Sequence, residues 1–152
     1  MFDRFGRKID YLRISVTDRC NLRCVYCMPE AGIIQKPQGE ILSFEQIYKI
    51  VKIAVRLGIQ KIRITGGEPL IRKDLHILIK SFKKINGLNE IALTTNGVLL
   101  SDYTASLKNA GLDRVNVSLD SLVSKRFEKI TRGAGLDRVL DGIESAFLAG
   151  FK

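Results

Sequence analysis

The chain has 152 residues, 45% of them hydrophobic, and a formal net charge of +9, which is the length and composition of one ordinary globular domain. Its apolar runs are shorter than the about 20 residues of a membrane-spanning helix, and the N-terminus lacks the apolar segment of a signal peptide. A basic chain attracts anions, but arginine-rich tracts with interleaved aromatic residues are missing. We therefore expect the partner to be an anionic small molecule rather than nucleic acid or a membrane. We also expect the protein to be located in the cytoplasm.

Strand-like and helix-like segments alternate along the chain. Ser43 and Gln46 form a capping box before a helix that ends at Gly58. Helical periodicity also predicts a helix at 75–82, one around Leu107 and Ala110, and one at 136–149. The predicted strands between these helices are residues 11–16, 61–65, 90–94 and 114–119.

This alternation implies an α/β fold with a parallel sheet and right-handed crossovers. About four βα units are present, and these cannot close an eight-stranded barrel. We therefore expect an open sheet or a partial (β/α) barrel, and residues 151–152 resemble the start of a fifth strand.

The three cysteines of the chain, Cys20, Cys24 and Cys27, lie in one short segment with the spacing C-x3-C-x2-C. A structural zinc site takes four ligands, and the single histidine, His76, lies far downstream in an apolar-periodic run. A disulfide between Cys24 and Cys27 would leave an odd thiol. Three thiolates suit a [4Fe-4S] cluster in which one iron keeps an open position, so the spacing favours an iron–sulfur site.

One face of the predicted sheet is aliphatic and the other is polar in every strand. Because buried parallel strands are normally apolar on both faces, a polar face indicates either solvent or a ligand cavity. Arg13 and Arg63 lie on this face, and arginine binds phosphate oxygens through a planar fork.

Several notable segments follow the ends of predicted strands, which is where parallel α/β folds bind ligands. They are the cysteine segment, Gly66-Gly67 and residues 118–120. Gly66 and Gly67 would let a ligand approach the backbone.

The cysteine spacing, Tyr26 before Cys27, and the segment Gly66-Gly67-Glu68-Pro69 resemble the radical S-adenosylmethionine (SAM) superfamily. Within it, the residues at 12–20, 62–70 and 93–97 are similar to the GTP 3',8-cyclase family, lyases that act in molybdenum cofactor biosynthesis. The resemblance implies a partial (β/α) barrel of the radical SAM type.

The resemblance also implies roles for individual residues. Cys20, Cys24 and Cys27 would hold a [4Fe-4S] cluster, and no catalytic residue beyond these ligands is expected. SAM would be cleaved to a 5'-deoxyadenosyl radical, and GTP would be converted to (8S)-3',8-cyclo-7,8-dihydroguanosine 5'-triphosphate. A reductant or an electron-transfer protein would be a partner, and a homodimer is an open alternative for the full-length family. The matching ligand-binding positions are Tyr26, Gly67 and Ser118 for SAM, and Arg13, Arg63 and Thr94 for GTP.

The resemblance covers only the N-terminal half of the family's pattern. Residues 1–152 correspond to the N-terminal part of a radical SAM core domain, and a second half with three more cysteines and a second cluster is absent. We therefore expect the isolated chain to be inactive. Two alternatives stay open: another radical SAM enzyme, such as a peptide-modifying maturase, and a catalytically inert truncated remnant.

Overall fold

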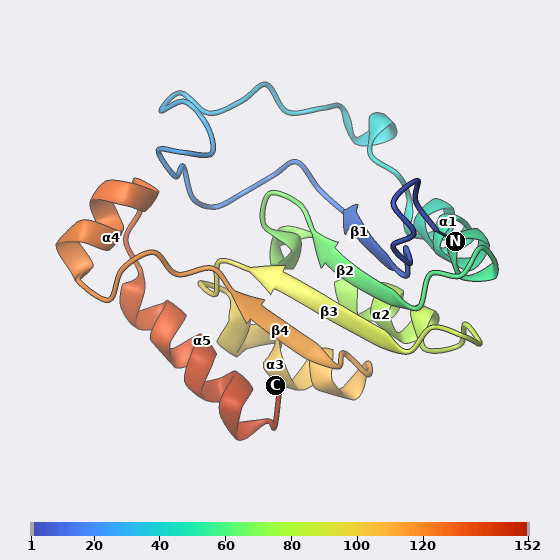
Figure 1. The fold of residues 1–152 in the computed structure, drawn as a ribbon. Helices are drawn as coiled ribbons and strands as arrows, with labels where there is room; N and C mark the ends of the chain where they lie inside the picture. The colour runs from blue at the N-terminus through green and yellow to red at the C-terminus, as the bar shows by residue number, and fades with distance from the viewer. Residues whose placement is uncertain (1, 152) are drawn as a thin grey trace.

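The computed structural model describes residues 2–151, without the side chain of Gln38. Four strands form one parallel sheet in the order β1-β2-β3-β4, as Figure 1 shows. The predicted α/β fold with an open parallel sheet is confirmed. The strands are β1 (Tyr11–Ser15), β2 (Lys61–Thr65), β3 (Glu90–Thr95) and β4 (Arg114–Val117).

Five α-helices and two short 3-10 turns connect and cover the strands. The predicted helices are confirmed as α1, α2, α3 and α5, whereas α4 was not predicted. The described helices are α1 (Phe44–Arg56), α2 (Leu75–Phe82), α3 (Leu100–Asn109), α4 (Ser124–Thr131) and α5 (Leu136–Leu148), and the turns are η1 (Gln38–Glu40) and η2 (Pro69–Ile71).

The strand boundaries differ slightly from the predicted ones. β1 ends one residue early and β4 two residues early, but Val16 N still donates to Thr65 O at 2.8 Å and Ser118 N to Thr95 O at 2.9 Å. Each pairing therefore continues for one bond beyond the regular strand. Phe151 lies outside any strand, and the second residue of the predicted fifth strand, Lys152, lies outside the described residues.

The start of α1 has the predicted capping box. Ser43 Oγ accepts a hydrogen bond from Gln46 N at 3.2 Å, and Gln46 Oε1 accepts one from Ser43 N at 2.8 Å. These bonds satisfy two amides that lack partners within the chain of helical hydrogen bonds. The helix ends at Arg56, and Gly58, which follows the cap residue Leu57, has a φ of +104° that glycine adopts easily.

The aliphatic face of the sheet packs on the helices and forms the main core. Figure 1 shows α2 and α3 against one face of the sheet, with α5 beside α3. The central strands contribute the most buried side chains. Separately, no helix in residues 2–151 is long and apolar enough to cross a bilayer. The strand residues with at most 1% exposure include Ile62, Ile64, Ile91 and Leu93.

The turn after β2 lies against the backbone that leads into the cysteine segment. Gly67 N donates to Thr17 O at 2.8 Å, and Glu68 N donates to Arg19 O at 2.7 Å. A Cβ at position 67 would lie 2.2 Å from Arg19 O. Glycine is therefore needed at position 67 because the chain's own backbone is so close, and the expected approach of a ligand to this turn stays a prediction.

We predict that Gly67→Ala lowers the free energy of unfolding by about 1–3 kcal/mol, since overpacking against backbone cannot be relieved by a side-chain rotation. Urea unfolding of both proteins would measure the difference. Gly39→Ala is the matched control, because a Cβ there meets nothing within 4 Å. Equal stability losses for the two substitutions would show that the approach of residue 19 does not constrain position 67.

Candidate functional site

The cysteine segment follows β1 and crosses the carboxyl edge of the sheet. Cys20 and Cys24 are half-buried and Cys27 is exposed. Cys27 N and Met28 N both donate to Cys24 O, at 2.9 and 3.2 Å, so Cys24 and Cys27 lie on one tight turn. Cys20 and Cys24 also contact a small apolar cluster made of Leu22, Val98, Phe127, Leu136 and Val139.

The surroundings of the cysteines suit sulfur ligands. Leu22 N donates to Cys20 Sγ at 3.4 Å, and Asn96 Nδ2 approaches the same sulfur at 3.9 Å. Burial raises the pKa of Cys20 and of Cys24, and the charges of Glu68 and Cys27 add to this effect at Cys20. The raised pKa of Cys20 and of Cys24 favours their protonated thiols, and binding of a metal would release these protons.

The sulfurs are not gathered around one point. Within residues 2–151, no three His, Cys, Asp or Glu side chains are arranged to hold a metal ion. Three cysteines on one short segment, with N–H groups directed at one sulfur, nevertheless match the donor set of a [4Fe-4S] cluster with one open iron. The residues present fit such a cluster in their chemistry, and the segment must tighten to bind it.

A buried carboxylate joins the ends of β2 and β3 beside this segment. Glu68 is 1% exposed. Its Oε1 accepts from Leu70 N at 3.0 Å and from Thr95 Oγ1 at 2.8 Å, and its Oε2 accepts from Asn96 N at 2.7 Å. Burial raises the pKa of Glu68, while the three donors act in the opposite direction. The side chain of Asn96 donates in turn to Asn21 Oδ1 in the cysteine segment, at 2.7 Å. Glu68 therefore positions Asn96, and Asn96 holds the cysteine segment.

The residues predicted for SAM lie at the carboxyl edge on three different elements. Tyr26 stands between Cys24 and Cys27, and its hydroxyl donates to Asp120 Oδ2 at 2.8 Å. Loss of water contact raises the pKa of Tyr26, and the bond to Asp120 raises it further. Ser118 is exposed just after β4, and Gly67 is exposed just after β2. The bond from Tyr26 to Asp120 was not predicted, although Asp120 had been placed on the polar face.

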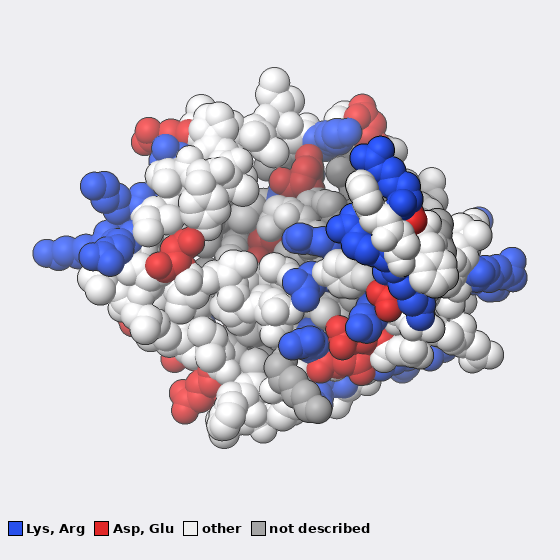
Figure 2. Space-filling view, viewed as in Figure 1, with Lys and Arg blue, Asp and Glu red and all other residues white. Residues whose placement is uncertain are grey.

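The residues predicted for GTP share the polar face of the sheet. Arg13 and Arg63 are direct partners in the β1–β2 register, and Thr94 is paired with Asn116 in β3–β4. Arg63 lies with its guanidinium 5.5 Å from the centre of the Tyr11 ring. Figure 2 shows Lys and Arg side chains gathered over the strands on this face. The strand phases predicted that the two arginines share a face, and the structure in addition brings them side by side.

Buried polar atoms without partners concentrate on the same face. Within residues 2–151, the buried side-chain atoms that lack a hydrogen-bond partner are Arg63 Nε, Thr94 Oγ1, Asn116 Oδ1 and Asp18 Oδ1. An unpaired buried polar atom costs about 1–3 kcal/mol, so a group of them indicates a place for a ligand. Sequence reasoning did not select Asn116 as a site residue, although its alternation with Val115 and Val117 was a usable signal.

Two cavities lie away from the residues predicted for SAM and GTP, and Asp18 lines one of them. One, of about 510 Å³, is bordered by residues 16–19 and the start of α1, and the other, of about 610 Å³, lies at the amino edge of β3 and β4. None of the residues predicted for SAM or GTP lines either of them. This is expected of a sheet that is not closed into a barrel, since the polar face is then open rather than enclosed.

The chain is similar to curated proteins over its full length. A protein named GTP 3',8-cyclase from Clostridium botulinum is 56% identical over 152 residues, which are 100% of this chain and 48% of that protein. A protein of the same name from Thermodesulfovibrio yellowstonii is 58% identical over 153 residues, again 48% of its length. This chain therefore spans about half the length of the curated relatives it matches.

Solved structures show the same fold at low sequence identity. Streptococcus suis SuiB bound to its precursor peptide SuiA aligns with a TM-score of 0.74 and 23% identity, over 94% of this chain and 31% of that chain. Methylornithine synthase (PylB) aligns with a TM-score of 0.74 and 17% identity, over 93% of this chain and 42% of that chain. The family description "Radical SAM superfamily" matches residues 14–152. Since that match takes in the cysteine motif and all four strands except the start of β1, the chain belongs to the radical SAM superfamily.

Proposed function

We propose that residues 1–152 are the N-terminal, SAM-binding part of the core domain of a GTP 3',8-cyclase, a lyase of molybdenum cofactor biosynthesis. The observation that carries this proposal is the polar face, where Arg13 and Arg63 lie in register beside the unpartnered atoms of Thr94 and Asn116. The 53–58% identity to proteins of that name supports it. The likeness to the peptide-bound SuiB is one of fold alone and does not favour a peptide substrate.

The proposed cofactors are those that membership of the superfamily implies, a [4Fe-4S] cluster and SAM. Cys20, Cys24 and Cys27 hold the cluster, and Tyr26, Gly67 and Ser118 lie where SAM would bind against it. When bound and reduced, the cluster supplies the electron that cleaves SAM to a 5'-deoxyadenosyl radical. A reductant or an electron-transfer protein delivers that electron.

The proposed substrate is GTP, which becomes (8S)-3',8-cyclo-7,8-dihydroguanosine 5'-triphosphate. The guanidinium groups of Arg13 and Arg63 bind phosphate oxygens through paired N–H donors, and Tyr11 holds the Arg63 side chain in place. Thr94 Oγ1, which has no hydrogen-bond partner among residues 2–151, offers a hydroxyl to the nucleotide. A cytoplasmic location and a homodimer of the full-length protein stay predictions.

We predict that anaerobic reconstitution gives about one [4Fe-4S] cluster per chain. Cys→Ser at position 20, 24 or 27 should abolish iron uptake, because an alcohol is a poor substitute for a thiolate ligand. Iron analysis and the absorbance spectrum would measure this. His76→Ala is the control and should keep the cluster. A chain that retains stoichiometric zinc and takes up no iron would contradict the proposed cofactor.

We predict that Arg13→Ala or Arg63→Ala weakens GTP binding by about tenfold to a hundredfold, since a charge-assisted contact contributes about 1.5–3 kcal/mol and about 1.4 kcal/mol is tenfold in affinity. The measurement is calorimetry on residues 1–152 joined to the remaining half of the Clostridium botulinum relative. Arg138→Ala is the control, because Arg138 pairs with Asp102 on the exposed surface at 2.8 Å.

The same joined protein tests the division of labour between the halves. We predict that residues 1–152 alone form no cyclised product from GTP, SAM and a reductant, because the relatives carry about as much chain again. Chromatography of the reaction mixture should show product only with the joined protein. Turnover by residues 1–152 alone would contradict the proposed half-domain.

A further inference from the structure

The turn that carries Cys24 and Cys27 is held at both of its ends by one side chain that is distant in sequence. Arg132 Nη1 donates to Arg23 O at 3.2 Å and to Met28 O at 3.1 Å. Arg23 directly precedes Cys24, and Met28 directly follows Cys27. A single guanidinium nitrogen therefore joins the two ends of the turn that carries the second and third cysteines.

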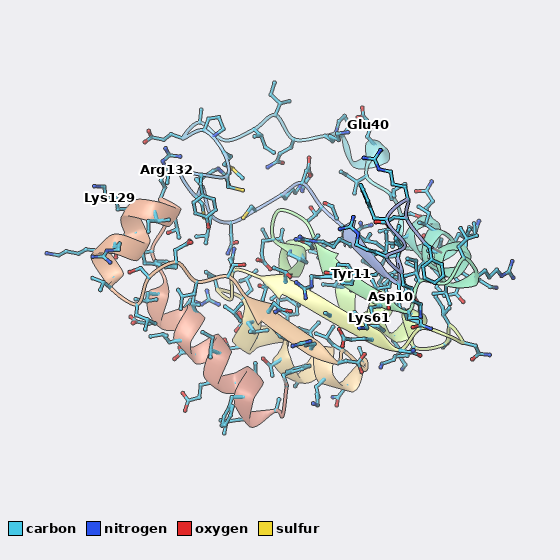
Figure 3. All side chains as sticks on the ribbon, in the orientation of Figure 1. Asp10, Tyr11, Glu40, Lys61, Lys129 and Arg132 are labelled. Carbon is cyan, nitrogen blue, oxygen red and sulfur yellow. The ribbon has the colours of Figure 1, made fainter. Side chains whose placement is uncertain are left out.

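The backbone of α4 holds the same segment. Arg23 N donates to Thr131 O, and Val25 N donates to Ile130 O, both at 2.9 Å. The last carbonyls of a helix have no partners within the helix, so the cysteine segment satisfies two of them. Figure 3 shows Arg132 where the end of α4 meets this segment.

The first cysteine is tied into the same set of bonds. Arg23 Nη1 donates to Cys20 O at 2.8 Å and to Leu22 O at 3.1 Å. Because the Arg23 carbonyl accepts from Arg132, the two arginines connect the backbone at all three cysteines. Leu22 packs in one apolar cluster with Phe127 of α4, which keeps the helix end against the segment.

The backbone of Arg132 is unusual for a residue with a side chain. Its φ is +51° and its ψ is +32°, in the left-handed region. Within residues 2–151, Asp74 is the only other non-glycine residue with a positive φ. This conformation is unfavourable for residues with a Cβ and suits glycine better. Such outliers persist where surrounding contacts enforce them, often at functional sites.

We infer that Arg132 is a positioning residue for the iron–sulfur cluster, which clamps the Cys24–Cys27 turn onto the end of α4. The inference rests on the proposed function for the presence of a cluster. The clamp itself consists of contacts within the protein. Without it, the turn keeps its cysteines but loses the bonds that fix both of its ends, so the segment samples more conformations and a bound cluster is released more readily.

The first measurement tests the clamp on the chain without a cluster. Hydrogen exchange of residues 23–28 should be about tenfold faster in Arg132→Gln than in the unmodified chain, because two charge-assisted bonds are lost. Arg126→Gln is the matched control: it removes the same charge from an exposed side chain of α4, the helix that Arg132 follows, and exchange at 23–28 should not change. Unchanged exchange in Arg132→Gln would overturn the clamp.

The second measurement tests the consequence for the cluster. Loss of the reconstituted cluster to a chelator should be about tenfold faster in Arg132→Gln, and the electron paramagnetic resonance spectrum of the reduced cluster should broaden. Arg132→Lys should restore part of the slow loss, since an ammonium keeps a charged donor but carries it on a flexible stem without the planar guanidinium. Arg126→Gln should behave as the unmodified chain.

Arg132→Gly separates positioning from stability. Glycine relaxes the left-handed backbone, so its melting temperature should not fall, yet cluster loss should be as fast as in Arg132→Gln. Faster exchange with unchanged cluster loss would overturn the positioning role. If the unmodified chain takes up no iron, the proposed function and the positioning role both fail, and the exchange result still decides whether the clamp exists.

Discussion

The parallel register between neighbouring strands determines where the chemistry of this chain is placed. Ile62 pairs with Leu12 and with Ile91, while Arg63 pairs with Arg13. A slip of one residue in β2 would turn Arg63 into the core and Ile62 to the open face. Burial of aliphatic side chains on the helix side opposes such a slip, so the same force that forms the core also keeps two arginines together on the other side.

The carboxyl edge is stabilised by polar contacts in addition to the small apolar cluster around Leu22 and Phe127. Glu68 accepts hydrogen bonds from Thr95 and Asn96 and so joins β2 to β3, and Asn96 continues to Asn21 in the cysteine segment. The turn at Gly67 lies against the backbone of Arg19. The cysteine segment is thus shaped by residues from several strands, which explains how a largely irregular stretch can present three thiols in a defined place.

Local patterns made much of the fold predictable. The capping box at Ser43, the helical periodicity and the alternation in the strands depend on residues close in sequence, and the structure confirms them. Helix α4 was missed because only Phe127 and Thr131 are buried among its residues, which leaves too narrow an apolar stripe for a periodicity argument. The shared face of Arg13 and Arg63 could be predicted from the alternation within each strand, whereas their direct pairing depends on the register that the structure shows.

Contacts between distant residues could not be predicted in this way. Tyr26 and Asp120 are 94 positions apart, and Arg132 lies 104 and 109 positions from the two carbonyls it binds. The need for glycine at position 67 has a second cause that the sequence does not reveal, since only the structure shows how close the backbone of Arg19 lies. Sequence motifs predict which residues belong to the site, and tertiary contacts determine how these residues are held.

The separation between the cysteines and Arg132 also orders events during synthesis of the chain. A ribosome adds Cys20, Cys24 and Cys27 about a hundred residues before it adds Arg132, which binds both ends of the turn that carries Cys24 and Cys27. Throughout that interval the nascent thiols lack the bonds supplied by α4 and Arg132. Iron that binds before Arg132 is added would bind a cysteine segment without these hydrogen bonds. Iron that binds after the chain has folded would bind a segment that these hydrogen bonds already hold.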